Sequence, residues 1–170
     1  TSNWIVGSLS NTKSLKIEVA ISEIGVKSWE FDPDHVFDNK GFEVFANREV
    51  YVSLRLRANN HAGSLVSKGV DGLGKSFRVG GMERQEEGDY SFFSLMATKN
   101  NTIVNLSFDP ALRTFISQNE LPQTIVLDKN ETYIAVFNGT HNDLFIGTHI
   151  ESQNNDIVVN SGSILGSFSN

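Results

Sequence analysis

Short runs in which apolar and polar residues alternate constrain this chain more than any other feature. The clearest run covers residues 50–57, where valine and leucine alternate with tyrosine, serine and arginine. A period of two places every second side chain on one face of a β-strand, whereas an amphipathic helix repeats every 3.6 residues. Asn, Ser and Gly, which favour turns and weaken helices, account for 50 of the 170 residues. The sequence therefore predicts an all-β fold that is rich in turns.

The number and spacing of these runs predict an antiparallel β-sandwich. We expect about ten or eleven short strands, spaced as in a sandwich or barrel, within a single β domain over residues 1–170. The arrangement is expected to be jelly-roll-like, and a propeller-like fragment is the alternative. Residues 58–76 are polar and rich in glycine, with a weak strand at 64–67, and residues 109–117 are the helix candidate. The expected strands are 15–21, 25–31, 41–45, 50–57, 77–79, 90–97, 102–108, 124–127, 132–137, 148–151, 156–160 and 163–168.

Two polar turns in the second half are expected to close β-hairpins. Lys99-Asn100-Asn101 follows the strand expected at 90–97, and Asp128 to Glu131 follows the strand expected at 124–127. Asn and Asp favour turns between two apolar runs, because they bond to nearby backbone and tolerate positive φ. The strands on either side of each turn are therefore expected to pair with each other.

The charge balance and the amino-acid composition argue against several classes of partner and site. The chain has 14 basic and 20 acidic residues, a net charge of −6, and its basic residues are scattered. Nucleic-acid binders concentrate positive charge to neutralise phosphates, so no nucleic-acid partner is expected. No run of about 18 apolar residues is present, so no membrane insertion is expected. The absence of cysteine excludes disulfides, thiolate catalysis and cysteine zinc sites.

One stretch matches the pattern of a nucleotide-binding P-loop. Gly69 to Ser76 reads G-x-x-x-x-G-K-S. That chemistry needs a helix directly after the loop, so that amides and the helix dipole converge on phosphate. Residues 76–79 instead alternate like a strand and are followed by Gly80 and Gly81. We therefore do not expect nucleotide binding.

The acidic loop of residues 32–39 is the candidate metal site. Asp32, Asp34 and Asp38 are closely spaced oxygen ligands of the kind that calcium prefers. The spacing of an EF-hand is absent, and the competing interpretation is a polar loop that closes a hairpin. Calcium is the only cofactor that the sequence suggests.

No motif in the chain predicts catalysis. The histidines are not spaced as metal-ligand pairs, and no nucleophile elbow, kinase or zinc-protease signature is present. The acidic run of residues 83–89 is typical of a solvated face. We therefore expect no enzyme activity and no catalytic residue. The four histidines are His35, His61, His141 and His149.

The second half carries four sequence blocks in a fixed order. They are Leu73 to Val79, Ser94 to Leu106, Thr124 to Tyr133, and Asp143 to Ser152, which is followed by Asp156 to Gly162. Together they resemble the "Leu-Gly-x-x-Tyr-x-Val", "Ala-Thr-x-Asp-Asn-Thr-x-Val-x-Ile", "Val-x-Leu-x-x-Gly-Glu-Thr-Tyr" and "Asp-Leu-x-Gly-Thr-x-Ile-x-Ser" segments of the IgGFc-binding-type domain. This type of domain is common in large exported surface proteins of gliding bacteria of the Flavobacterium type.

The chain departs from the family pattern at a few positions. Asn130 stands where the family has a hairpin glycine, and Asn enters the left-handed region readily. Phe145-Ile146 contains one additional residue, which suggests a bulge or a longer loop. Asp156 replaces a proline. Immunoglobulin binding does not transfer to this chain on these residues.

The resemblance implies an extracellular, cell-surface location and an adhesin-like role. We expect a non-catalytic binding or spacer module, forming a piece of a larger surface protein, with a glycan or protein partner. Loops 32–39 and 82–89 are the candidate binding loops. The alternative is a calcium-assisted carbohydrate-binding module, which would present coplanar exposed aromatics, and a hydrolase would instead need a pocket of converging carboxylates or histidines. The aromatics to locate are Trp4, Trp29, Tyr51 and Tyr90.

Overall fold

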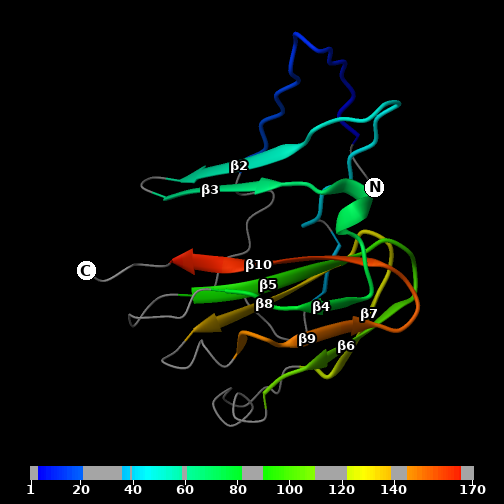
Figure 1. Cartoon of the computed structure of the whole chain (residues 1–170), viewed down its shortest axis with the longest axis vertical. Helices are drawn as coiled ribbons and strands as arrows, with labels where there is room; N and C mark the ends of the chain where they lie inside the picture. Colours follow the sequence, from blue (N-terminus) through cyan, green and yellow to red (C-terminus); the bar gives the residue numbers. More distant parts are fainter. Residues whose placement is uncertain are drawn as a thin grey trace.

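The described part of the chain is built from β-strands (Figure 1). The computed structural model describes residues 4–20, 36–38, 40–58, 61–81, 90–109, 122–138 and 145–165. A 3-10 turn, η2 (Gly69–Gly72), lies between the third and fourth strands. The strands are β1 (Val36–Phe37), β2 (Ser53–Ala58), β3 (His61–Val66), β4 (Ser76–Arg78), β5 (Tyr90–Ala97), β6 (Thr102–Ser107), β7 (Thr124–Leu127), β8 (Thr132–Asn138), β9 (His149–Ser152) and β10 (Ile157–Leu165).

Eight of these strands form two antiparallel sheets of four. One sheet has the order β1-β8-β5-β10 and the other has the order β4-β9-β6-β7. In Figure 1 the two sheets are stacked layers, with the β2–β3 pair as a further layer above β10. Two packed sheets of four strands are the architecture of a jelly roll. The prediction of an all-β antiparallel sandwich is therefore confirmed, and the propeller-like alternative is wrong.

The core lies between the two sheets and follows the period of two. In β6, Thr102, Val104 and Leu106 are buried while the residues between them are partly exposed. Phe93 of β5 is fully buried. Stacked rings of Phe137 and Phe145, with centroids 4.7 Å apart, connect β8 to the turn before β9. The buried apolar residues are Val79, Phe93, Leu95, Ala97, Val104, Leu106, Ile125, Leu127, Tyr133, Ala135, Phe137, Phe145, Ile150 and Ile157.

The predicted hairpins at the two polar turns are wrong. β5 pairs with β8 and β10, and β6 pairs with β7 and β9, so β5 and β6 belong to different sheets. β7 and β8 are separated in the same way. Each turn therefore carries the chain from one sheet across to the other. Alternation of apolar residues reports which face is buried, and it is the same for a hairpin and for a crossing between packed sheets.

Several predicted strands in the first half do not pair with another strand. Residues 15–20 and 41–45 are described but carry no strand, and Leu15 and Ile17 are 43% and 48% exposed. A strand needs a partner ladder as well as alternation, and within the described residues these segments have none. The strand predicted at 25–31 lies outside the described residues, as does the helix candidate after Asp109.

Two predicted boundaries also change. β3 replaces the loop and weak strand expected within residues 58–76, and it pairs with β2 along its whole length. The runs predicted at 156–160 and 163–168 join in one strand, β10, up to Leu165, where the described residues end. This strand has a register shift between Ser163 and Leu165. Ser161 and Gly162 stay in the ladder opposite Phe93 and Phe92 of β5. The small residues within 58–76 and at Ser161 and Gly162 were interpreted as interruptions of a strand. The neighbouring strand, β2 or β5, instead holds them in an extended conformation.

The P-loop pattern is occupied by a turn and the start of a strand. Gly69 has φ +59° at the start of η2, and Gly74 exchanges backbone hydrogen bonds with Ile157 of β10. Ser76 then begins β4, which pairs with β9. Because a strand stands where a phosphate-binding helix would be needed, this stretch lacks the geometry of a P-loop.

Candidate functional site

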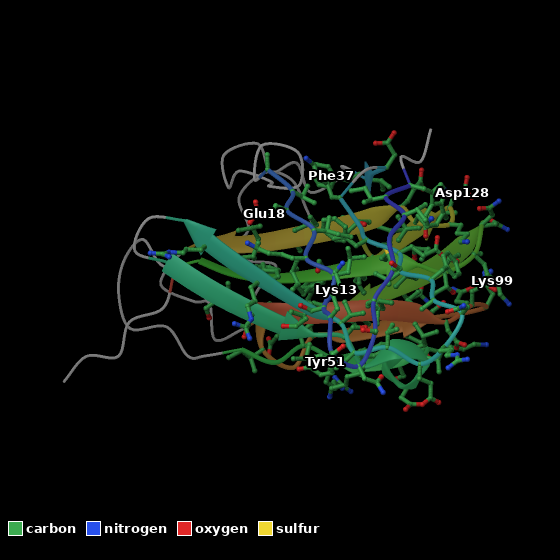
Figure 2. The ribbon with its side chains drawn as sticks, turned by 90° about the horizontal axis from the view of Figure 1, so that it is seen from above. Lys13, Glu18, Phe37, Tyr51, Lys99 and Asp128 are labelled. Carbon is green, nitrogen blue, oxygen red and sulfur yellow. The ribbon has the colours of Figure 1, made fainter. Side chains whose placement is uncertain are left out.

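Three connections meet at one end of the sandwich and form what we call the loop end. They are residues 98–101 after β5, 128–131 after β7 and 153–156 after β9. Figure 2 shows Lys99 and Asp128 together at this end of the molecule. The loop end was not among the loops that the sequence singled out, which were 32–39 and 82–89.

The first two connections are held to each other by reciprocal hydrogen bonds. The backbone N–H of Asn101 donates to Oδ1 of Asp128 over 2.9 Å, and the backbone N–H of Lys129 donates to Oδ1 of Asn100 over 2.9 Å. Each side chain satisfies a backbone donor of the other loop, as Asn and Asp commonly do in turns. The two crossings between sheets are therefore fastened together.

Asn154 joins the third connection to this pair. Its Oδ1 accepts from the Ile103 amide over 3.1 Å, and its Nδ2 donates to the Asn101 carbonyl oxygen over 2.7 Å. The neighbouring Asn155 donates from Nδ2 to Oγ1 of Thr102 over 3.2 Å. Asparagine side chains in one connection thus satisfy backbone groups in another connection or at the start of a strand.

Two asparagines at the loop end adopt the left-handed conformation. Asn101 has φ 54° and Asn130 has φ 71°. Asn tolerates this region because its short side chain bonds locally, so the expectation for Asn130 in place of glycine is confirmed. The turn is closed by the Asp128 amide, which donates to Oε2 of Glu131 over 2.7 Å.

Asn101 offers a clean test of this conformation, since its side chain has no hydrogen-bond partner within the described residues. We expect Asn101→Gly to change the free energy of unfolding by less than about 0.5 kcal/mol. Asn101→Val is expected to lower it by about 1–2 kcal/mol, because a β-branched residue is strained at positive φ. Urea unfolding measures both, with Lys99→Val as the control for an exposed valine. Equal losses for the two valine variants would contradict the left-handed assignment.

A fourth segment docks on the loop end from the N-terminal part of the chain. Oε1 of Glu43 lies 3.0 Å from Nζ of Lys129, and its Oε2 accepts from Nδ2 of Asn130 over 3.1 Å. Nζ of Lys129 also lies 5.8 Å from the ring centroid of Phe45, within cation–π range. The Trp4 ring lies 5.6 Å from that of Phe45. Residues 43–45 therefore extend the loop end with an aromatic edge.

The loop end has the properties of a binding surface on a rigid support. The side chains of Asn100, Asp128 and Asn154 hold the three connections together. Lys99, Gln153 and Asp156 are exposed, and their side chains make no hydrogen bond within the described structure. Because the backbone that carries them is already held, little backbone entropy is lost when a partner binds. Loops on a rigid sandwich are a common place for recognition.

The calcium prediction stays a prediction. Asp38 is exposed and directly follows β1, whose Phe37 pairs with Thr132. Asp32 and Asp34 lie outside the described residues, as do most of loop 32–39 and all of loop 82–89. Among the residues that the structure describes, no three His, Cys, Asp or Glu side chains gather to hold a metal ion.

The exposed aromatics do not form a flat platform in the described structure. Trp4 and Tyr51 are 60% and 77% exposed, but the planes of Trp4 and Phe45 are inclined by 49°. Trp29 and the side chain of Tyr90 lie outside the described residues. The carbohydrate-binding alternative therefore remains an expectation without a described aromatic platform.

One histidine contacts a serine. Nε2 of His149 lies 2.8 Å from Oγ of Ser76, on the outer face of the β4–β9 pair. Catalysis by such a pair would also need a group that orients the imidazole, and Nδ1 of His149 has no hydrogen bond in the described part of the chain. This contact is a cross-strand pair of the kind that stabilises sheets. His35 and His141 lie outside the described residues, as does the side chain of His61.

Comparison with known proteins adds one finding about ancestry. A model of the family described as IgGFc binding protein matches residues 62–170, from within β3 to the end of the sequence given. No curated protein and no solved structure matches the chain significantly. Within the described residues, no helix has the length and apolar character needed to cross a bilayer. The family is one of binding domains. Because the match covers more than half of the residues, this chain belongs to the IgGFc binding protein family.

Proposed function

We propose that this chain is a non-catalytic, extracellular binding module of a cell-surface adhesin and that it binds a protein partner through the loop end. Membership of a family of binding domains is the observation that carries the proposal. The family name refers to a protein ligand, which favours a protein partner over a glycan. The loop end supports the same conclusion, because its backbone is held by side chains from three connections.

The chemistry of the loop end suits a polar protein surface. Lys99 and Asp156 offer charges of both signs, and Gln153 offers an amide beside them. Trp4 and Phe45 provide exposed aromatic area at its margin. Interfaces of the antibody type combine aromatic anchors with adaptable amide and hydroxyl groups in this way. Such a surface gives specificity without a deep pocket.

An adhesion measurement tests the proposal. Beads carrying the chain are expected to adhere to a surface coated with extracellular-matrix protein, and a second surface coated with IgG Fc tests separately whether this chain shares the ligand in the family name. The triple variant K99A/Q153A/D156A is expected to reduce adhesion at least tenfold. It removes exposed side chains and leaves intact the hydrogen bonds that Asn100 and Asn154 make between the connections. The control K75A/S107A/E151A truncates exposed residues on β4–β9–β6 and their margin and is expected to adhere normally. Adhesion to glycan-coated surfaces alone, or equal loss in both variants, would contradict the proposal.

A further inference from the structure

The β2–β3 hairpin is hydrogen-bonded to no third strand among the described residues. β2 and β3 pair with each other from Ser53–Val66 to Ala58–His61, and neither is hydrogen-bonded to another described strand. The described side chains of both strands are exposed on both faces, including Leu56 at 47% and Leu65 at 44%. In Figure 1 the hairpin is a separate layer, with β3 nearer to β10 and β2 outside it.

A two-stranded hairpin of this kind is incomplete as a folding unit. An isolated pair of strands is marginally stable in water, and a third strand or a packed face is needed for stability. β2 is also a regular six-residue strand without proline. Such an edge presents unpaired amides and carbonyls that can template another strand. The outer edge of β2 can therefore accept a further strand.

The hydrogen-bond pattern of the hairpin shows which backbone N–H and C=O groups of β2 point away from β3. The Ser67 amide donates to the Val52 carbonyl oxygen over 3.1 Å, which makes this pair hydrogen-bonded across the hairpin. Alternate residues of an antiparallel strand point their backbone groups to opposite sides. The amides and carbonyls of Arg55 and Arg57 consequently lie on the free edge of β2.

The charge of the hairpin indicates what kind of strand would add there. Residues 50–68 contain three basic side chains and no acidic one, a local charge of +3 in a chain whose net charge is −6. Arg55 and Arg57 share one face, opposite Ser64 and Ala62 of β3. Within the described structure neither guanidinium has an ion pair or hydrogen bond. An added strand would place its own side chains directly beside these two arginines.

We propose that the outer edge of β2 binds an extended peptide segment in which acidic and apolar residues alternate. The segment adds as a third strand, its carboxylates facing Arg55 and Arg57 and its apolar side chains on the face of Leu54 and Leu56. Opposite charges across a pair of strands are stabilising, and like charges are destabilising. Pairing of β2 with β2 of a second copy would juxtapose arginines, so the partner is a different, acidic segment.

This inference rests on the proposed protein-binding function but concerns a second surface. The probe is a short fluorescein-labelled peptide of alternating valine and glutamate, titrated with the whole chain and followed by anisotropy. Saturable binding that weakens as salt is raised is the expected result. R55E/R57E is expected to weaken binding at least tenfold, and the control K13E/K75E, with the same change in charge, is expected to bind like the parent chain.

Two modified peptides separate strand addition from simple charge attraction. A peptide that is N-methylated at the residues whose backbone N–H groups point at β2 is expected to lose binding, because these groups can no longer donate hydrogen bonds to the strand edge. A peptide with lysine in place of glutamate is expected not to bind. Equal binding of the N-methylated peptide, preference for the lysine peptide, or no saturable binding would overturn the proposal. The variant R55Q/R57Q removes the two charges without reversing them. It is expected to keep the circular dichroism spectrum of the parent chain and to bind the peptide more weakly, which separates loss of charge from a folding defect.

The loop-end triple variant distinguishes this proposal from the preceding one. It is expected to bind the acidic peptide as the parent chain does, although its adhesion is reduced. Loss of adhesion with peptide binding retained separates the two surfaces, whereas loss of peptide binding in that variant would overturn the assignment to β2. Self-association that sedimentation detects in the parent chain but not in R55E/R57E would also overturn it, since the edge would then serve a second copy.

Discussion

Phe93→Ala is expected to lower the free energy of unfolding by about 3–5 kcal/mol. Phe93 is fully buried at the middle of β5, and its ring packs against aromatic rings from three directions. Their centroids lie 6.4, 6.2 and 6.1 Å away in Phe108, Tyr133 and Phe137. Removing the ring leaves a cavity that rigid strands cannot close. A domain typically has only about 5–15 kcal/mol of stability, so this variant is expected to be partly unfolded at moderate temperature.

Phe92→Ala is the matched control for this prediction. Phe92 is the preceding residue of β5, points to the opposite face of the sheet and is half-buried. Its truncation is expected to cost less than half as much in urea unfolding, since solvent already reaches the ring. Phe93→Leu, which keeps most of the apolar volume, is expected to lie between the two. A larger loss for Phe92→Ala than for Phe93→Ala would show that the inward and outward faces of β5 are assigned the wrong way round.

The sequence predicted the strands of the second half well because their alternation is strict and their turns are polar. β5 and β7 match the predicted ranges, and the inward residues of β6 follow the period of two. The first half was harder, since Leu15 and Ile17 alternate with charged residues yet pair with no described strand. Alternation gives the faces of a strand but not the existence of its neighbour.

The loop end could not be predicted for a related reason. Asn100 and Asn101 were interpreted only as turn residues and Asn154 was not singled out, but the side chains of Asn100 and Asn154 connect turns distant in sequence. Asn101 and Asn154 are in contact because β6 and β9 are antiparallel neighbours in one sheet, with Val104 opposite Ser152. A turn signal is local, whereas the pairing of turns depends on which sheet each strand joins. The signal that the sequence did carry was the asparagines in the connections after β5, β7 and β9.

Asn154→Ala is expected to loosen the loop end more than any other single side-chain removal there. The substitution removes the acceptor of the Ile103 amide and the donor to the Asn101 carbonyl oxygen in one step. Leaving backbone groups unpaired costs about 1–3 kcal/mol, and the lower part of that range applies where water can replace the side chain. Urea unfolding measures the loss, and hydrogen exchange of the Ile103 amide reports whether the bond itself is gone.

Asn154→Asp and Gln153→Ala make the result specific. The aspartate keeps an acceptor for the Ile103 amide but removes the donor to Asn101, so slow exchange at Ile103 is expected to persist in Asn154→Asp and to be lost in Asn154→Ala. Gln153→Ala truncates an exposed neighbour and is expected to change stability by less than about 0.5 kcal/mol. Unchanged Ile103 exchange in Asn154→Ala would mean that another group holds this amide. Asn101 is the last residue of the connection that brings the chain from β5 to β6, and Asn154 follows β9, the neighbour of β6. Fast exchange in Asn154→Ala that is confined to Ile103 and its neighbours would therefore identify Asn154 as the side chain that couples this connection to β9.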